Sequence, residues 1–201
     1  MDWIDPKPAP WPLAVVQDFV NTASRLHGSD VLETAAQSTA ELAALELIAH
    51  GDRIKATDRQ RLVAFREALR DLLLAHNSTA NHQADPGASA KALDDVVGAV
   101  PIRVRFSPDG RPTLQPSADS APVDQAIGTM LAVMAAAEAE GNWQRVKACR
   151  NDNCRWAFYD ASRNRSGRWC DMNVCGVRHK MRAYRERQVA GTSKSPESDS
   201  G

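Results

Sequence analysis

The four cysteines of this 201-residue chain form two matched pairs within a short C-terminal stretch. Four residues separate Cys149 from Cys154 and Cys170 from Cys175, and fifteen residues separate the pairs. Two such loops can bring four thiolates to the corners of one tetrahedron, which zinc prefers in structural sites. Two disulfides are the alternative, but the first residues, MDWIDPKPAPWP, do not resemble a secretory signal. We therefore expect one Zn²⁺ with a structural role, because a closed four-thiolate shell leaves no position for substrate.

The segment around the cysteines is strongly basic, although the whole chain is neutral. Residues 143–187 contain twelve Lys or Arg and four acidic residues, a net charge of +8, whereas the remaining residues carry a net charge of −8. Such asymmetry is typical of a polyanion-binding module attached to an ordinary globular domain. The alternative is a basic module that docks on its own acidic partner domain.

Length and composition favour one main domain and one small module. Apolar residues make up 43% of the chain, and no stretch approaches the eighteen consecutive apolar residues of a membrane-spanning helix. We expect a mainly helical domain over 13–142, a zinc finger over 143–187 and a disordered polar tail over 188–201. Reduced, metal-ready cysteines favour a cytoplasmic location.

Apolar residues at helical spacing and capping signals predict five helices before the cysteines. The first is expected over 13–26. The second follows a capping box of Ser38 and Glu41 and ends near Gly51, and the third runs from a box of Thr57 and Gln60 through Leu72. The fourth runs from Ser89 through Val97, and the fifth from Pro122 to about Gly141.

Two segments show the alternating side-chain pattern that is typical of β-strands. Residues 102–106 alternate apolar and basic residues, and a turn-forming segment, 107–110, separates them from 113–115, which predicts a β-hairpin. Within the finger we expect a second hairpin between residues 156–160 and the region of Trp169, followed by a helix over 176–187. The predicted fold is therefore α+β and mainly α, with a treble-clef-like finger.

At these residues the chain resembles a known family. Segments 160–166 (DASRNRS), 168–170 (RWC) and 175–178 (CGVR) resemble the CGNR zinc finger, and 18–22 (DFVNT) is similar to the motif that opens the ABATE domain. The resemblance implies a bacterial, cytoplasmic, stress-linked transcription regulator whose finger binds DNA. Val177 stands where the motif has Asn, and its spacing with Met181 and Tyr184 suggests packing against the finger's hairpin.

Arginine and lysine side chains on two adjoining elements are candidates for nucleic-acid contact. Guanidinium groups suit bidentate contact with phosphates and with guanine edges in the major groove. The predicted contact residues are Arg163, Arg165 and Arg168 in the loop, and Arg178, Lys180, Arg182, Arg185 and Arg187 on the helix.

A second candidate site lies on the first helix. Asp18 and Asn21 are one helical turn apart and could hold a small-molecule effector; a buried hydrogen-bonded pair or a solvated edge is the alternative. The sequence also leaves a homodimer open.

The sequence contains no constellation for nucleophilic catalysis, no phosphate-binding glycine loop and no acid/base carboxylate pair, so we expect no enzyme. A DNA-binding regulator is favoured. Two alternatives remain: an RNA-binding or ribosome-associated protein that uses the same surface, and a protein-interaction module with a structural zinc.

Overall fold

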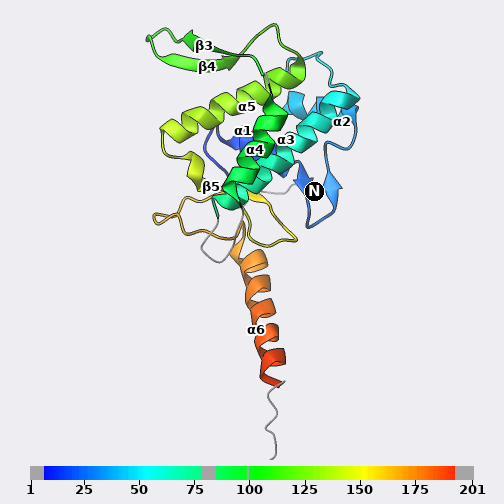
Figure 1. Cartoon of the computed structure of the whole chain (residues 1–201), viewed down its shortest axis with the longest axis vertical. Coiled ribbons are helices and arrows are strands. Elements are labelled where there is room, and N and C mark those ends of the chain that lie inside the picture. The colour runs from blue at the N-terminus through cyan, green and yellow to red at the C-terminus, as the bar shows by residue number, and fades with distance from the viewer. Residues whose placement is uncertain (1–6, 78–84, 99, 193–201) are drawn as a thin grey trace, which may run out of the picture.

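The computed structural model describes residues 7–77, 85–98 and 100–192. Helices form most of the body, the described residues also form three two-stranded antiparallel sheets, and helix α6 (Val177–Thr192) projects from one end (Figure 1). The mainly helical fold with small sheets is thus confirmed. None of the helices in this described part combines the length and apolar character needed to cross a bilayer.

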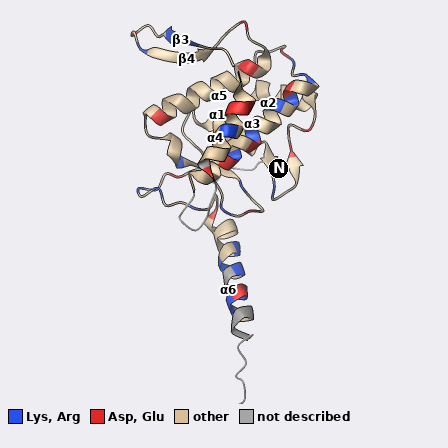
Figure 2. Cartoon of the chain, in the orientation of Figure 1, with Lys and Arg blue, Asp and Glu red and all other residues tan. Residues whose placement is uncertain are grey.

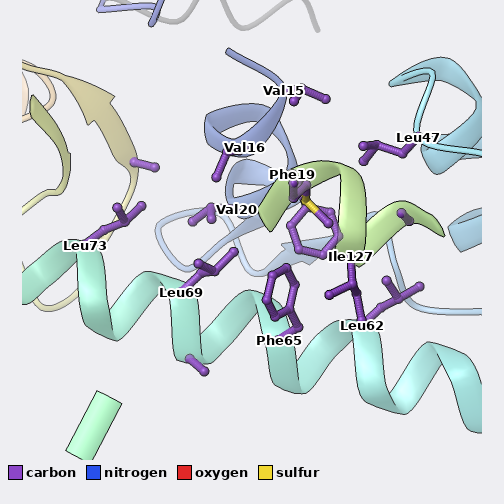
Figure 3. Packing of buried hydrophobic residues seen from close by; sticks show 14 of the residues in the cluster. Val15, Val16, Phe19, Val20, Leu47, Leu62, Phe65, Leu69, Leu73 and Ile127 are labelled. Carbon is purple, nitrogen blue, oxygen red and sulfur yellow. The ribbon is translucent and has the colours of Figure 1, made fainter. Parts of the chain in front are cut away.

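The long helix α3 (Ala56–Ala75) is the centre of the core. Its buried residues Leu62, Phe65, Leu69 and Leu73 recur at helical spacing and form one apolar face. This face meets α1 (Ala14–Asn21) and α5 (Pro122–Ala139), as Figure 3 shows. The ring centroids of Phe19 and Phe65 lie 6.0 Å apart at the centre of this packing.

Helix α2 (Ala35–Ala44) begins one turn before the predicted cap. The Thr34 side chain accepts a hydrogen bond from the backbone N–H of Gln37, whereas the predicted cap, Ser38, lies inside the helix and is buried. Thr34 and Gln37 form the same pattern as the predicted box, so spacing alone could not separate the two. The helix ends well before Gly51, because Glu46 adopts a φ of 57° and closes the last turn.

The predicted caps of the next two helices are also wrong. Helix α3 begins after Lys55 without a side-chain cap, and Thr57 lies within its first turn. Helix α4 (Pro86–Val97) is capped by Asp85, so the predicted cap, Ser89, is a helical residue. The polar, turn-rich segment 77–87 before it is expected to form a surface loop; this prediction falls mainly on 78–84, outside the described residues. Helix α5 begins at Pro122 as predicted.

Helix α1 ends at Asn21, five residues before its predicted end. The fully buried guanidinium of Arg70 donates to the carbonyl oxygens of Val20 at 2.6 Å and Ala23 at 3.2 Å, so it satisfies backbone acceptors at the helix terminus. Short strands β1 (Ala23–Ser24) and β2 (Ser29–Asp30) follow. Arg66 forms a bidentate pair with Asp30, which holds this small hairpin on α3.

The hairpin predicted from the alternating segment is present. Strand β3 (Ile102–Phe106) pairs in antiparallel register with β4 (Pro112–Pro116), and the pair lies along α5 at the end of the body opposite α6 (Figure 1). Gly128 permits this approach, because a Cβ there would lie 2.9 Å from the Pro116 side chain.

The finger and the helical domain share one core. Strand β5 (Val146–Ala148) pairs with β6 (Ala157–Tyr159), and the buried residues Val146, Ala148 and Ala157 belong to the same apolar cluster as Phe19 and Leu69. Packing therefore crosses the predicted boundary at residue 142. The division into units over 13–142 and 143–187 remains a prediction.

Polar contacts reinforce this junction. The Asn21 side chain donates to the Ala157 carbonyl at 3.0 Å and accepts from the Ala157 N–H at 2.8 Å. Asn77 donates to the Ala148 carbonyl at 2.7 Å from the end of α3, and His76 contacts the Val146 carbonyl at 2.9 Å. Burial lowers the pKa of His76, which favours the neutral ring at this junction.

We expect Asn21→Ala to lower the free energy of unfolding by about 2 kcal/mol, because it leaves the buried Ala157 N–H without a partner and the Ala157 carbonyl with only a long 3.4 Å hydrogen bond from Gln17. Gln60→Ala is the control, since Gln60 is exposed and was predicted to cap α3; it should change stability by less than about 0.5 kcal/mol. Urea unfolding followed by circular dichroism measures both. Equal effects of the two substitutions would contradict the junction described here.

Candidate metal centre and basic surface

The two cysteine pairs lie on different local structures. Cys149 follows β5 and Cys154 precedes β6, so the first pair occupies the turn of this hairpin. Cys170 lies in the following loop, and Cys175 lies in the π-helical turn η2 (Met172–Gly176) that leads into α6. All four side chains are buried.

The sulfur atoms have the separation that a zinc ion requires. All four lie within 4.8 Å of one another, with Cys154 Sγ 3.6 Å from Cys170 Sγ and Cys170 Sγ 3.9 Å from Cys175 Sγ. A tetrahedral Zn–S site with bonds of about 2.3 Å places its sulfurs about 3.8 Å apart. The donor set and spacing fit zinc, and no disulfide joins the cysteines.

Electrostatics show why this cluster suits a dication. Hydrogen bonding to Cys154 and Cys170 lowers the pKa of Cys149 to about 2. Hydrogen bonding to that thiolate in turn raises the pKa of Cys154 to about 12, and the pKa of Cys170 is raised as well. The thiols therefore compete for a single negative charge, whereas a bound Zn²⁺ stabilises four thiolates together.

Backbone and side-chain contacts fix the ligand loops. The N–H of Cys149 donates to the Trp156 carbonyl, and the Asn151 amide approaches Cys175 Sγ at 3.5 Å. The Asp171 carboxylate caps η2 by accepting the N–H groups of Asn173 at 2.6 Å and Val174 at 2.9 Å. Phe158, Trp156 and Trp169 pack around the sulfurs and form a separate small core.

The predicted hairpin between the cysteine pairs is wrong in its partner. Strand β6 pairs with β5, while the loop that carries Trp169 is bound through the Arg168 carbonyl, which accepts from the Arg150 N–H and from Asn77. Strand β5 is the partner of β6, and the apolar side chains of Val146 and Ala148 on β5 are buried in the main core. The finger keeps the order of knuckle, loop and helix.

A buried carboxylate organises the loop between the cysteine pairs. Asp160 accepts from Lys147 Nζ at 2.7 Å, from Ser162 Oγ at 2.6 Å and from the Gly167 N–H at 2.7 Å. Burial tends to raise its pKa, but these donors outweigh burial and lower the pKa of Asp160 to about 2. A Cβ on Gly167 would lie 2.8 Å from the Asp160 carboxylate, so this position requires glycine.

All eight predicted contact residues lie on the surface. Arg163, Arg165 and Arg168 are exposed on the loop that Asp160 holds, and the five on α6 are exposed along the projecting helix. Figure 2 shows Lys and Arg on α6 and on loops near its base. Helix α6 continues to Thr192, beyond its predicted end; residues 193–201 of the predicted tail lie outside the described residues.

The predicted packing of the apolar stripe on α6 is wrong. Val177, Met181 and Tyr184 are 44%, 53% and 58% exposed, since α6 projects from the body (Figure 1). The Val177 side chain, which stands in place of the motif's Asn, is therefore not packed against the hairpin of the finger.

Asn21 and Asp18 occupy different surroundings. Asp18 is exposed, whereas Asn21 binds Ala157 of β6. Asn21 also lines a pocket of about 280 Å³ between the β1–β2 turn and the cysteines, so its place in an effector site remains a prediction. Sequence reasoning missed Asp160 as the loop's anchor, although its position ahead of a Ser- and Gly-containing loop was a usable signal.

We expect the purified protein to contain about one zinc per chain, and Cys154→Ser to lose most of it, because three thiolates leave the shell open. Asp152→Asn is the control, since this exposed residue lies in the same loop, pairs with Arg155 and is not part of the cysteine cluster. Elemental analysis after gel filtration measures both. Unchanged zinc in Cys154→Ser would contradict the assignment of the ligands.

We expect Asp160→Asn to lower the free energy of unfolding at pH 7 by about 3 kcal/mol, because it leaves Lys147 buried without its carboxylate. The contribution is full above the ordinary pKa of about 4 and disappears as pH falls through about 2. Asp119→Asn is the exposed control. Denaturant unfolding at several pH values measures the free energy of unfolding of both variants. Equal free energies for the two variants across this pH range would contradict the role given to Asp160.

Comparison with known protein families agrees with this geometry. Residues 145–188 match the CGNR zinc finger, and residues 13–140 match the ABATE family, described as "Putative stress-induced transcription regulator". A search of curated proteins returned no match. The buried cysteines, clustered like a zinc site, fall inside the CGNR match. The chain therefore belongs to the ABATE family and carries a CGNR zinc finger after its ABATE domain.

Proposed function

We propose that this protein is a cytoplasmic transcription regulator that binds double-stranded DNA through its zinc-held finger. The observation that carries the proposal is the projecting helix α6, which has five exposed Lys or Arg between residues 178 and 187 and a single acidic residue, Glu186, in that interval. The family description supports a regulator but does not name DNA.

The shape of α6 suits a groove of duplex DNA. Its sixteen residues correspond to a length of about 24 Å, and an α-helix with side chains is about 10–12 Å wide. The major groove of B-DNA is about 12 Å wide and admits one helix. Because α6 extends away from the body, other elements do not obstruct its approach (Figure 1).

The zinc centre would set the direction of this helix. Cys175 lies in the turn that becomes α6, and its N–H donates to the Asp171 carbonyl at 3.0 Å. Metal ligation of Cys175 therefore anchors the first turn to the body. The Asp160-centred loop presents Arg163 and Arg165 from the same finger, as a second set of cations for backbone phosphates.

Double-stranded RNA is a poorer partner for this geometry. The major groove of A-form RNA is deep and narrow, and side chains on a helix cannot read it. A protein partner is also less favoured, because the charged residues of α6 are five cations and one carboxylate, which suits a polyanion. A zinc ion with four thiolate ligands has no open position for a substrate, which argues against a catalytic role of the metal.

We expect the affinity for duplex DNA to fall steeply with salt, with a log–log slope of roughly −4 to −6. Arg185→Ala should weaken binding similarly on all sequences and flatten the slope by about one unit. Arg53→Ala is the control, because Arg53 is exposed on the helical domain, away from the finger. Fluorescence anisotropy on random and genomic duplexes over a salt series measures all three proteins.

Salt-independent binding, or no binding near physiological salt, would contradict the proposal and favour a protein partner. Tighter binding to RNA duplexes or hairpins than to DNA would favour the RNA-binding alternative. Zinc content is measured for every variant, so loss of the finger's structure is not mistaken for loss of a phosphate contact.

A further inference from the structure

A small cationic pocket lies between the turn that carries the first cysteine pair and the first turns of α6. Its volume is about 170 Å³, and it is lined by residues of this turn, of α6, of the loop before it and by Leu26 of the helical domain. Three of the lining residues are arginines, namely Arg150, Arg178 and Arg182. They come from two separate elements and converge on one cavity.

These arginines lack strong acidic partners. None of the described residues that line the pocket is an Asp or Glu, and Arg178 has no ion-pair partner among the described residues. Arg182 lies 3.6 Å from Glu186 on the same helix, but both side chains are more than 60% exposed, so that pair is weak. No carboxylate lines the described part of the pocket, so its three guanidinium groups are available to an anion.

Arg150 is held in place before any ligand arrives. Its Nε donates to the Asn77 carbonyl at 2.5 Å, which fixes the side chain against the end of α3. The guanidinium group lines the same cavity as Arg178 and Arg182, so it is already placed beside them. A bound anion could therefore contact Arg150 without moving this side chain.

An aromatic surface lies beside the arginines. The Trp169 and His179 rings also line the pocket, with their centroids 4.8 Å apart and their planes inclined by 37°. The backbone of Trp169 is fixed by a hydrogen bond, because its carbonyl oxygen accepts from Lys7 Nζ at 2.6 Å. A phosphate among guanidinium groups and a flat surface next to it are the two features that recognise a nucleotide unit.

We propose that this pocket binds one phosphate group of a nucleotide unit, with Arg150 as its fixed anchor and the sugar or base against Trp169. Arg178 and Arg182, one turn apart on α6, close on the phosphate from the other side. The inference deepens the proposed function and rests on it where the phosphate belongs to the DNA backbone. A free mononucleotide carries the same chemistry and is the second source.

The experiment measures two kinds of binding on the zinc-loaded full chain. Calorimetry is done with inorganic phosphate and with dAMP, and anisotropy is done with a short DNA duplex at one fixed salt concentration. Arg150→Gln and Arg178→Gln remove pocket arginines; Arg178 is exposed, so this second variant tests the pocket even where Arg150→Gln unfolds the finger. The control is Arg187→Gln on α6: Arg187 lies outside the pocket but belongs to the predicted nucleic-acid contacts, so this variant measures the loss of an ordinary surface cation.

We expect each pocket variant to weaken its ligand by about tenfold or more, and the control by about twofold, because a charge-assisted hydrogen bond contributes more than a screened surface charge. Weaker duplex binding assigns the site to backbone phosphate. Weaker dAMP binding with unchanged duplex affinity assigns it to a free nucleotide.

Equal loss of duplex affinity in all three variants, together with no binding of phosphate or dAMP at millimolar concentration, would overturn the pocket as a specific site. That result would leave the proposed function intact, because salt-dependent duplex binding by the unaltered protein is measured in the same titrations. Absence of duplex binding with retained dAMP binding would instead overturn the proposed function and keep the pocket.

Discussion

The β5–β6 hairpin is the interaction on which both halves of the molecule depend. One face of it contributes Val146, Ala148 and Ala157 to the core around α3, and its turn carries the first two cysteines. The helical domain therefore supplies the platform on which half of the zinc shell is built. The other half, from Cys170 and Cys175, is positioned through the Arg168 carbonyl and the capped turn before α6.

The features that depend on local sequence could be predicted. The cysteine spacing indicated the metal centre, and the apolar periodicity indicated the long helix α3 and the helix that begins at Pro122. Helix caps were predicted less well. Thr34 and Gln37 form a possible capping box one turn before that of Ser38 and Glu41. In the structure Thr34 is the cap, and Ser38 is a buried residue inside the helix.

Features that depend on distant residues could not be read from the pattern. The end of α1 is set by Arg70, almost fifty residues later in the chain, and the partner of β6 is set by which strand can bury its side chains against α3. The apolar stripe of α6 has the spacing of a packed face, yet its residues are exposed, because periodicity does not reveal whether a neighbouring element exists. Whether the eight outward cations touch nucleic acid remains a prediction.

Net charge alone also overstates the surface available to a polyanion. Three cations of the basic segment bind other residues of the finger. Arg145 donates to the Asp160 and Ser162 carbonyls, Lys147 donates to the Asp160 carboxylate, and Arg155 donates to Asp152. Charge used in this way holds loops in place. Arg150 donates to the Asn77 carbonyl. The other eight cations of the segment lie on one loop and on α6, so the basic surface of the finger is confined to these two elements.

The shared hairpin has a thermodynamic consequence for the ABATE domain. A ligand that binds only the folded state stabilises every part of the structure that unfolds with its site, by an amount that grows with the logarithm of the free ligand concentration. Since the strand next to Cys149 is also a wall of the helical core, zinc occupancy and the folding of the helical domain are linked equilibria. The metal that holds the finger thus also stabilises a domain that contributes none of its ligands.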